Sequence, residues 1–259
     1  MPPKSEPSAR NRTLRILQLF EMDPIWSVEA IAGKIGISVS STYRDVQELC
    51  GAGFLVPVVG AGYVLGPAFV QFDRLVRLSD PLIRVAATRM LALLADTTQR
   101  AVAVLSRRYR DQVMCVHQVS GSAPHPLTLY ERGVAMPMFT GATSKVILAH
   151  QSERTLERIY LEKEERIRAT LECATWKDFR AQLEEIREAG VAVTRSEMVQ
   201  GRVGIAAPIF ASKQVIAGLS LVLHESDYGA EDYAGTVIRT AKDITAALSH
   251  EDPWIARGL

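Results

Sequence analysis

Three amphipathic segments followed by two β-rich runs fill the first 66 residues. Apolar side chains recur every three positions between residues 11 and 22, which predicts a helix that Asp23-Pro24 ends. Ser27 is a suitable N-cap for a second helix, and Gly36 makes the turn after it. The positions predicted to form the buried faces of these two helices are Leu14, Leu17, Phe20, Val28, Ile31 and Ile35.

A third helix is predicted from Ser38, its N-cap, to the glycines Gly51 and Gly53. Its inner face is expected to hold Val39, Val46 and Leu49, with Thr42 beside them. The polar remainder faces outward: Ser40, Ser41, Tyr43, Arg44 and Gln47. Residues 54–59 and 63–65 then form a hairpin across Gly60-Ala61-Gly62. This order predicts a helix-turn-helix with a β wing, a shape that fits the major groove of DNA.

The composition changes after Gly66-Pro67, and the remaining pattern predicts a larger α+β unit. Strand-like runs and helices are mixed here in a way that favours one antiparallel sheet flanked by helices. We expect helices over 68–78, 81–96, 140–150, 152–167, 176–189 and 230–249, and strands over 101–106, 112–119, 127–130, 191–195, 203–210 and 215–223. The predicted domains are a flexible arm over 1–9, a winged helix-turn-helix over 10–66, a linker helix over 67–80 and an effector-binding and oligomerisation domain over 81–251.

Composition narrows the class of protein. The chain has 259 residues, 47% hydrophobic residues, and no apolar run long enough to span a membrane. Its polar N-terminus is no secretory signal, and its three widely spaced cysteines form no disulfide framework, so we predict a cytoplasmic protein. The first 66 residues carry six basic and six acidic side chains. Because this N-terminal DNA-binding head has no net charge, we predict that one copy alone binds DNA weakly. The neutral charge also leaves open an alternative, a sensor or scaffold that binds no DNA and whose winged helix contacts protein.

Motifs for catalysis or metal binding are missing from the sequence. It contains no Gly-x-Ser-x-Gly elbow, P-loop or HExxH motif, so neither an enzyme nor a cofactor is predicted. The glycines at 60, 62 and 66 lie between two strands rather than before a helix, so they are assigned to the wing tip. Cys115 and His117 should share one face of a strand, but no further ligands follow at a zinc-site spacing.

Several blocks of sequence together resemble the IclR family of bacterial transcriptional regulators. In the N-terminal part they are RTLRILQLF, IAGKIGISVSSTYRDVQEL, GFLV and YVLG. In the C-terminal part they are TGATSKVILAH, LEEIREAGVAVTRSEMVQGRVGIAAPIF and VIAGLSLVL. The resemblance implies a winged helix-turn-helix, a linker helix and a GAF-like effector domain. It also implies homodimers, often paired into homotetramers on a double-stranded operator, and control by a small organic molecule, with a repressor of a catabolic operon favoured over an activator.

Residues for DNA contact follow from the wing and this resemblance. The start of a recognition helix lies closest to base edges and phosphates. Arg44 would bind a phosphate or a guanine, unless it pairs with Glu48 one turn later. A basic cluster at the start of the first helix would grip the flanking DNA backbone or reach a minor groove, unless it is only solvated. The predicted DNA contacts are Arg10, Arg12, Arg15, Ser40, Ser41, Thr42, Tyr43, Arg44 and Gln47.

Residues for effector binding are placed by the resemblance around the helix that follows Thr140, which is expected to cap it. Free amides at a helix N-terminus attract anions, so Gly141 and Ala142 suit a ligand carboxylate. The Ser220 hydroxyl lies in an apolar strand and needs a partner, either a ligand or a backbone carbonyl. Small residues leave room for a ring, which favours an aromatic or short aliphatic acid. The predicted pocket residues are Leu129, Met136, Met138, Gly141, Ala142, Thr194, Gly204, Ser220 and Val222.

Overall fold

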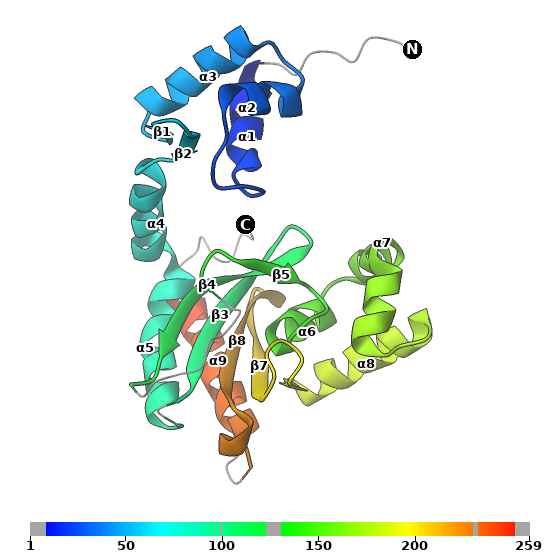
Figure 1. Ribbon diagram of the computed structural model, residues 1–259. Helices are drawn as coiled ribbons and strands as arrows, with labels where there is room; N and C mark the ends of the chain where they lie inside the picture. The colour runs from blue at the N-terminus through cyan, green and yellow to red at the C-terminus, as the bar shows by residue number, and fades with distance from the viewer. Residues whose placement is uncertain (1–8, 99, 123–130, 230–232, 252–259) are drawn as a thin grey trace. The chain divides into compact units, whose positions relative to one another are not determined.

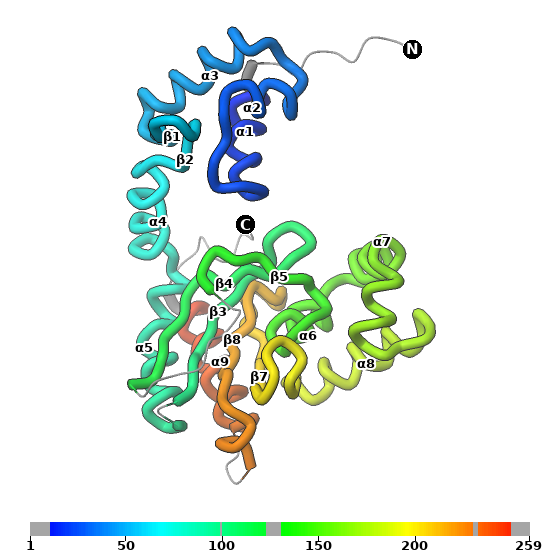
Figure 2. Tube along the Cα trace, viewed as in Figure 1, coloured from blue at the N-terminus to red at the C-terminus, as the bar shows by residue number. Residues whose placement is uncertain are grey.

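The computed structural model describes residues 9–98, 100–122, 131–229 and 233–251. The chain divides into two compact units, Met1–Ser79 and Asp80–Leu259 (Figure 1), and Figure 2 traces the path of the chain through each of them. Leu129, the predicted strand over 127–130 and the predicted arm, apart from Ala9 at its end, lie outside the described residues.

The first unit contains three helices, a hairpin and a fourth helix. These are α1 (Ala9–Leu19), α2 (Val28–Ile35), α3 (Val39–Gly51), β1 (Leu55–Val58), β2 (Gly62–Leu65) and α4 (Ala68–Ser79). Both predicted N-caps are confirmed, because Ser27 accepts a hydrogen bond from the Ala30 amide and Ser38 accepts one from the Ser41 amide. Gly36 takes the left-handed conformation, with φ of 81°, that ends α2.

The core of the first unit confirms most of the predicted inner faces and corrects two of them. It is built from Ile16, Leu19, Phe20, Ile31, Ile35, Val46, Leu49 and Leu55. Leu14 is 62% exposed and Val39 is 49% exposed, so both were wrongly predicted to be inner residues. A strict three-residue spacing drifts around a helix of 3.6 residues per turn, whereas the spacing of Ile16, Leu19 and Phe20 keeps one face. Val39 lies in the first turn of α3, before that helix reaches the core.

The predicted wing is an antiparallel hairpin in which Leu55 pairs with Leu65 and Val58 with Gly62. A β-bridge between Trp26 and Tyr63 fastens the hairpin to the segment before α2. Helix α4 packs its first turns against the wing, since the ring of Phe54 contacts those of Phe69 and Phe72.

The second unit is an antiparallel six-stranded sheet with helices on its faces, in strand order β5-β4-β3-β8-β7-β6 (Figure 1). This confirms the predicted fold class. Two short elements, β5 (Ala135–Pro137) and the 3₁₀ turn η1 (Glu225–Asp227), were not predicted. The elements are α5 (Pro81–Ala95), β3 (Val102–Tyr109), β4 (Gln112–Ser120), β5 (Ala135–Pro137), α6 (Ala142–Ala149), α7 (Glu153–Leu171), α8 (Trp176–Ala189), β6 (Ala192–Arg195), β7 (Arg202–Ala211), β8 (Gln214–His224), the 3₁₀ turn η1 (Glu225–Asp227) and α9 (Tyr233–Glu251).

Alternation along the strands gives the sheet two different faces. Side chains such as Leu105, Val203 and Leu221 point toward α5 and α9 and form the main core with them. The opposite face carries Val102, Val104 and Val222. Helix α6 covers part of this second face, where Ala142 and Val146 pack against Ala192 and Ala206.

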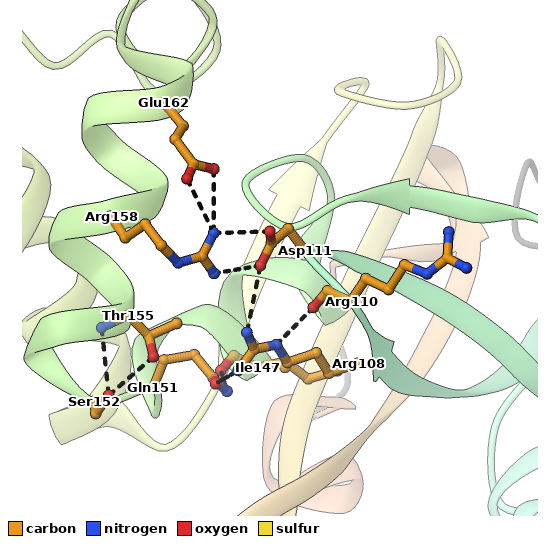
Figure 3. A network of polar contacts seen from close by, with 9 residues as sticks. All are labelled: Arg108, Arg110, Asp111, Ile147, Gln151, Ser152, Thr155, Arg158 and Glu162. Atoms are coloured by element: carbon orange, nitrogen blue, oxygen red, sulfur yellow. Dashed lines mark hydrogen bonds and ion pairs between the residues drawn. The ribbon is translucent and has the colours of Figure 1, made fainter. Parts of the chain in front are cut away.

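Helices α7 and α8 form a separate apolar cluster with α6. A polar network attaches α7 to the sheet (Figure 3). Arg158 of α7 binds the Asp111 carboxylate in the β3–β4 turn through both of its terminal nitrogens, at 2.5 and 2.8 Å. Arg108 of β3 donates to Gln151 at 2.7 Å. The hydrogen bonds from Arg158, and then its charge, hold the pKa of Asp111 below its ordinary value against the effect of burial.

The predicted pairing of Cys115 and His117 on one strand face is wrong. A β-bulge lies between them, because Ser106 pairs with Cys115 while its neighbour Leu105 pairs with His117. Burial raises the pKa of the Cys115 thiol to about 11, so the thiolate that a metal needs is disfavoured. The described residues hold no group of histidine, cysteine and acidic side chains suited to a metal ion, and none of their helices could cross a membrane.

Candidate functional site

The outer side of α3 is polar and exposed, opposite its packed side. Ser40, Tyr43, Arg44 and Gln47 are exposed, and Ser41 is half-buried. Gln47 donates a long hydrogen bond of 3.4 Å to the Tyr63 hydroxyl of the wing. The outer side of α3 therefore lies beside the wing.

Two residues predicted to contact DNA face the protein instead. Thr42 is fully buried, and its hydroxyl donates to the Ser38 carbonyl at 3.1 Å. Its position one turn after the N-cap turns it inward, so it cannot reach a groove. Arg12 donates to the buried Asp45 carboxylate of α3 at 3.0 Å, which ties α1 to α3. Its guanidinium is therefore not the free phosphate ligand that the sequence suggested.

The DNA-contact roles of the other basic candidates stay predictions. Arg15 is half-buried in α1, and the side chain of Arg10 lies outside the described residues. The alternative pairing of Arg44 with Glu48 is not found, since no ion pair joins them in the described part of the chain. Arg44 is thus an exposed cation on the outer side of α3.

Four of the predicted effector residues, Thr194, Gly204, Ser220 and Val222, lie on the second face of the sheet. Register places Val102, Val222, Gly204 and Thr194 side by side across four strands. Directly paired residues in an antiparallel sheet share a face, so these four form one row. Ser220 lies in the next row, opposite Val104 and Ala206.

Two glycines let the start of α6 approach this face closely. A Cβ on Gly204 would lie 3.2 Å from the Thr194 hydroxyl oxygen and 3.6 Å from the Ala142 Cβ. A Cβ on Gly218 would lie 2.9 Å from the Thr143 methyl group. Ala142, Thr194 and Gly204 are therefore brought together, as the sequence predicted.

The two methionines among the predicted pocket residues lie in different places. Met136 packs against Val102, Val104 and Val222 and so borders the second face. Met138 is fully buried among the residues of α6, α7 and α8, and does not lie with the other candidates. Met136 lies in β5, whereas Met138 comes just after the strand ends. The rule that residues two apart in a strand share a face therefore does not apply to them.

Helix α6 begins differently from the prediction. Gly141 is its N-cap, with φ of 79°, and no side chain caps it, so the assignment of Thr140 as the cap is wrong. The Gly141 amide donates to the Glu197 carboxylate at 3.2 Å, and the Lys145 ammonium donates to the same carboxylate at 2.7 Å. The anion position that the sequence offered to a ligand is thus filled by a side chain of the protein.

Buried hydroxyls without partners mark the region around α6. The oxygens of Ser106, Thr143, Ser144 and Ser220 are buried and have no hydrogen-bond partner among the described residues. The backbone carbonyl that was the alternative partner for Ser220 is therefore not found. Buried polar groups are nearly always paired in proteins, so four exceptions on α6 and the strands beside it call for an explanation.

Sequence reasoning missed three residues here: Lys145, Glu197 and Arg202. Glu197 lies in the turn between β6 and β7, and Arg202 is the first residue of β7. Neither position carries a periodic or spacing signal. Only the register of β7 reveals that Arg202 shares the face of Gly204.

The first unit is a winged helix-turn-helix. The second carries small residues and buried hydroxyls without hydrogen-bond partners around α6. This combination is typical of a transcriptional regulator with one DNA-binding and one effector-binding domain. The family model for the C-terminal part of the bacterial transcriptional regulator IclR matches residues 77–250. The chain belongs to the IclR family of bacterial transcriptional regulators.

Relatives agree with this assignment over nearly the whole chain. The HTH-type transcriptional regulator KipR of Bacillus subtilis is 27% identical over 246 residues, which cover 93% of this chain and 95% of KipR. An IclR homologue of Microbacterium hydrocarbonoxydans, solved with 4-hydroxybenzoate, has 20% identity and a TM-score of 0.72, covering 93% of this chain and 99% of the homologue. Pseudomonas aeruginosa HmgR has 21% identity and a TM-score of 0.70, covering 93% and 98%. The curated relatives are named regulators, which confirms that this chain is not an enzyme.

Proposed function

We propose that the first unit binds an operator through the outer side of α3, and that the second unit binds a small organic acid which changes the affinity for that operator. The observation that carries the proposal is the exposed polar side of α3 beside the wing. In this arrangement the protein represses a catabolic operon in the cytoplasm, and the acid releases it.

The first two turns of α3 supply the DNA contacts. Ser40, Tyr43 and Arg44 lie where a recognition helix comes closest to base edges, and Gln47 follows one turn later. Arg44 has no internal ion pair among the described residues, so its guanidinium is available to a phosphate or a guanine. The neutral charge of one head makes two heads on two half-sites necessary, which a homodimer or homotetramer provides.

Replacing Arg44 tests the DNA contact. A gel shift with the intergenic DNA upstream of the gene should show a discrete band for the wild type. Arg44→Ala should weaken binding about tenfold or more, since one good base or phosphate contact contributes about 1–3 kcal/mol. Arg154→Ala is the matched control, because Arg154 is an exposed arginine on α7 of the second unit.

Equal binding by the wild type and Arg44→Ala would refute the role of Arg44. Binding that does not fall as salt rises would argue against phosphate contacts and for the protein-contacting alternative.

The second face of the sheet supports the effector part of the proposal. Small residues around the start of α6 and the unpaired Ser220 hydroxyl suit a compact ligand with polar groups. The homologue from Microbacterium hydrocarbonoxydans binds 4-hydroxybenzoate, and the same chemical class is proposed for this chain. A panel of aromatic and short-chain carboxylates, added to the gel shift, should contain one that weakens the band.

Coupling between the units is proposed to be a population shift. The acid favours one arrangement of the effector domains, and α4 transmits it as a change in the spacing of the two heads. An operator affinity that is the same with and without every acid that binds the protein would contradict this mechanism.

A further inference from the structure

Arg202 lies at one end of the second face of the sheet. Its neighbour Val203 points into the core against α5 and α9, so strand alternation turns Arg202 to the face of Gly204. Register pairs Arg202 with His224, one row beyond the row of Gly204 and Val222. The arginine therefore borders the same apolar floor as the proposed effector site.

The Arg202 guanidinium has no partner in the described part of the chain. Its Nε is buried without a hydrogen bond, and no ion pair is formed by its other nitrogens. The carboxylate of Asp227, whose charge acts on Arg202, is already held by Arg100 through two hydrogen bonds. Burial, and then the charge of Arg100, lower the pKa of Arg202, which shows that its surroundings disfavour the cation as it stands.

We infer that Arg202 is the residue that selects an anionic effector, by receiving the carboxylate of the ligand. This inference rests on the proposed effector function of the same face. A partly buried cation that lacks an acceptor is costly, and a planar guanidinium matches a carboxylate with two parallel hydrogen bonds. A carboxylate placed there removes the cost, whereas a neutral group of the same shape does not.

The start of α6 does not compete for that carboxylate. Glu197 already accepts from the Gly141 amide and from Lys145, so a second anion there would meet a negative charge. The same face thus has one anion position that is filled and one cation that is unpaired.

The opposite end of the ligand is defined by Ser220. Arg202 and Ser220 are separated by one apolar row, that of Val222 and Gly204, and the Cα atoms of residues four apart along a strand are separated by ~13 Å. A ligand that contacts both groups would lie across this apolar row. The ligand class is an aromatic monocarboxylic acid with a hydroxyl or oxo group opposite the carboxylate, which the unpaired Ser220 hydroxyl would bind.

Calorimetric titration of the full-length protein tests this with four probes: benzoate, 4-hydroxybenzoate and the two corresponding neutral amides. The wild type should bind each acid more tightly than its amide. Arg202→Gln should weaken the acids about 10- to 100-fold, as expected for a lost charge-assisted pair, and leave the amides unchanged. Ser220→Ala should remove the preference for 4-hydroxybenzoate over benzoate.

Arg195→Gln is the matched control. Arg195 lies on the neighbouring strand but pairs with Val203, so it belongs to the other face, and its replacement should not alter the affinities.

Acids that bind no better than amides, acids that do not bind at all, or equal weakening of acids and amides by Arg202→Gln would each overturn the role of Arg202. A gel shift that responds to one of the amides would show that the effector function holds although this inference fails. Loss of folding is monitored by circular dichroism, and Arg202→Lys, which keeps the charge without the fork, should then retain part of the preference for acids.

Discussion

Replacing Gly66 with alanine should destabilise the first unit, because the added methyl group would meet backbone atoms rather than side chains. An ideal Cβ on Gly66 would lie 2.2 Å from the Gly53 carbonyl oxygen and 2.9 Å from its carbon. The Gly66 amide donates a hydrogen bond to the Phe54 carbonyl at 2.7 Å. The Ala68 amide donates one to the Gly53 carbonyl at 3.1 Å. These contacts join the wing to the start of α4.

The cost follows from how far the two backbones must separate. Cβ contacts under 3.0 Å are essentially not observed, so the segments must move apart by at least 0.8 Å. Overpacking of this kind costs about 1–3 kcal/mol. Each of the two stretched hydrogen bonds contributes about 1 kcal/mol. We therefore expect Gly66→Ala to lower the free energy of unfolding of the first unit by about 3–5 kcal/mol.

The matched control is Gly33→Ala, which should act in the opposite direction. Gly33 lies inside α2, and no atom lies within 4 Å of a Cβ added there. In the interior of a helix alanine is more stable than glycine by about 0.5–1 kcal/mol. Hydrogen–deuterium exchange of peptides from the first unit, followed by mass spectrometry, measures both changes without separating the two units. Gly66→Ala with the exchange rates of the wild type, or Gly33→Ala with faster exchange, would refute the reasoning.

Three further outcomes are expected. Asp45→Asn should destabilise the first unit by about 1–3 kcal/mol in urea unfolding, because Arg12 loses its partner while Asp45 stays buried; an unchanged midpoint would contradict this. Burial lowers the pKa of His150 below its unfolded value, so the unfolded state binds the proton more tightly and stability is full above about pH 6.5 and falls below it. His150→Gln should flatten the dependence of the melting temperature on pH over that window, and an equally steep slope would exclude His150 as its source. The Cys115 thiol, with a pKa of about 11, should react with iodoacetamide roughly 100-fold more slowly than a free cysteine until the protein unfolds, which peptide mass mapping would show.

Local signals in the sequence were sufficient for most helices and strands. Ser27 and Ser38 cap the helices that they were predicted to cap, and Gly190 ends α8 in the left-handed conformation. The strands β6, β7 and β8 lie within a residue or two of their predicted bounds. Such signals depend on neighbours in the chain, so they can be read without knowledge of tertiary contacts.

Features that depend on distant residues could not be read in this way. The bulge that separates Cys115 from His117 arises where one strand pairs with another. Glu197 reaches the start of α6 from a turn 56 residues away, which no spacing rule predicts. Thr194, Gly204 and Val222 were predicted as pocket residues from the resemblance to the IclR family. Only the strand register shows that they form one row across the sheet.

The polar groups on the second face of the sheet bear differently on ligand affinity. A ligand gains little at Glu197 and Lys145, since these two charges already satisfy each other and would have to separate first. It gains more at an unpaired buried group, because each such group costs the protein about 1–3 kcal/mol until a partner arrives. Arg202 and Ser220 are two such groups with an apolar row between them. The free energy of binding should therefore depend on the two ends of the ligand, and an acid without the second polar group should bind more weakly than one that has it.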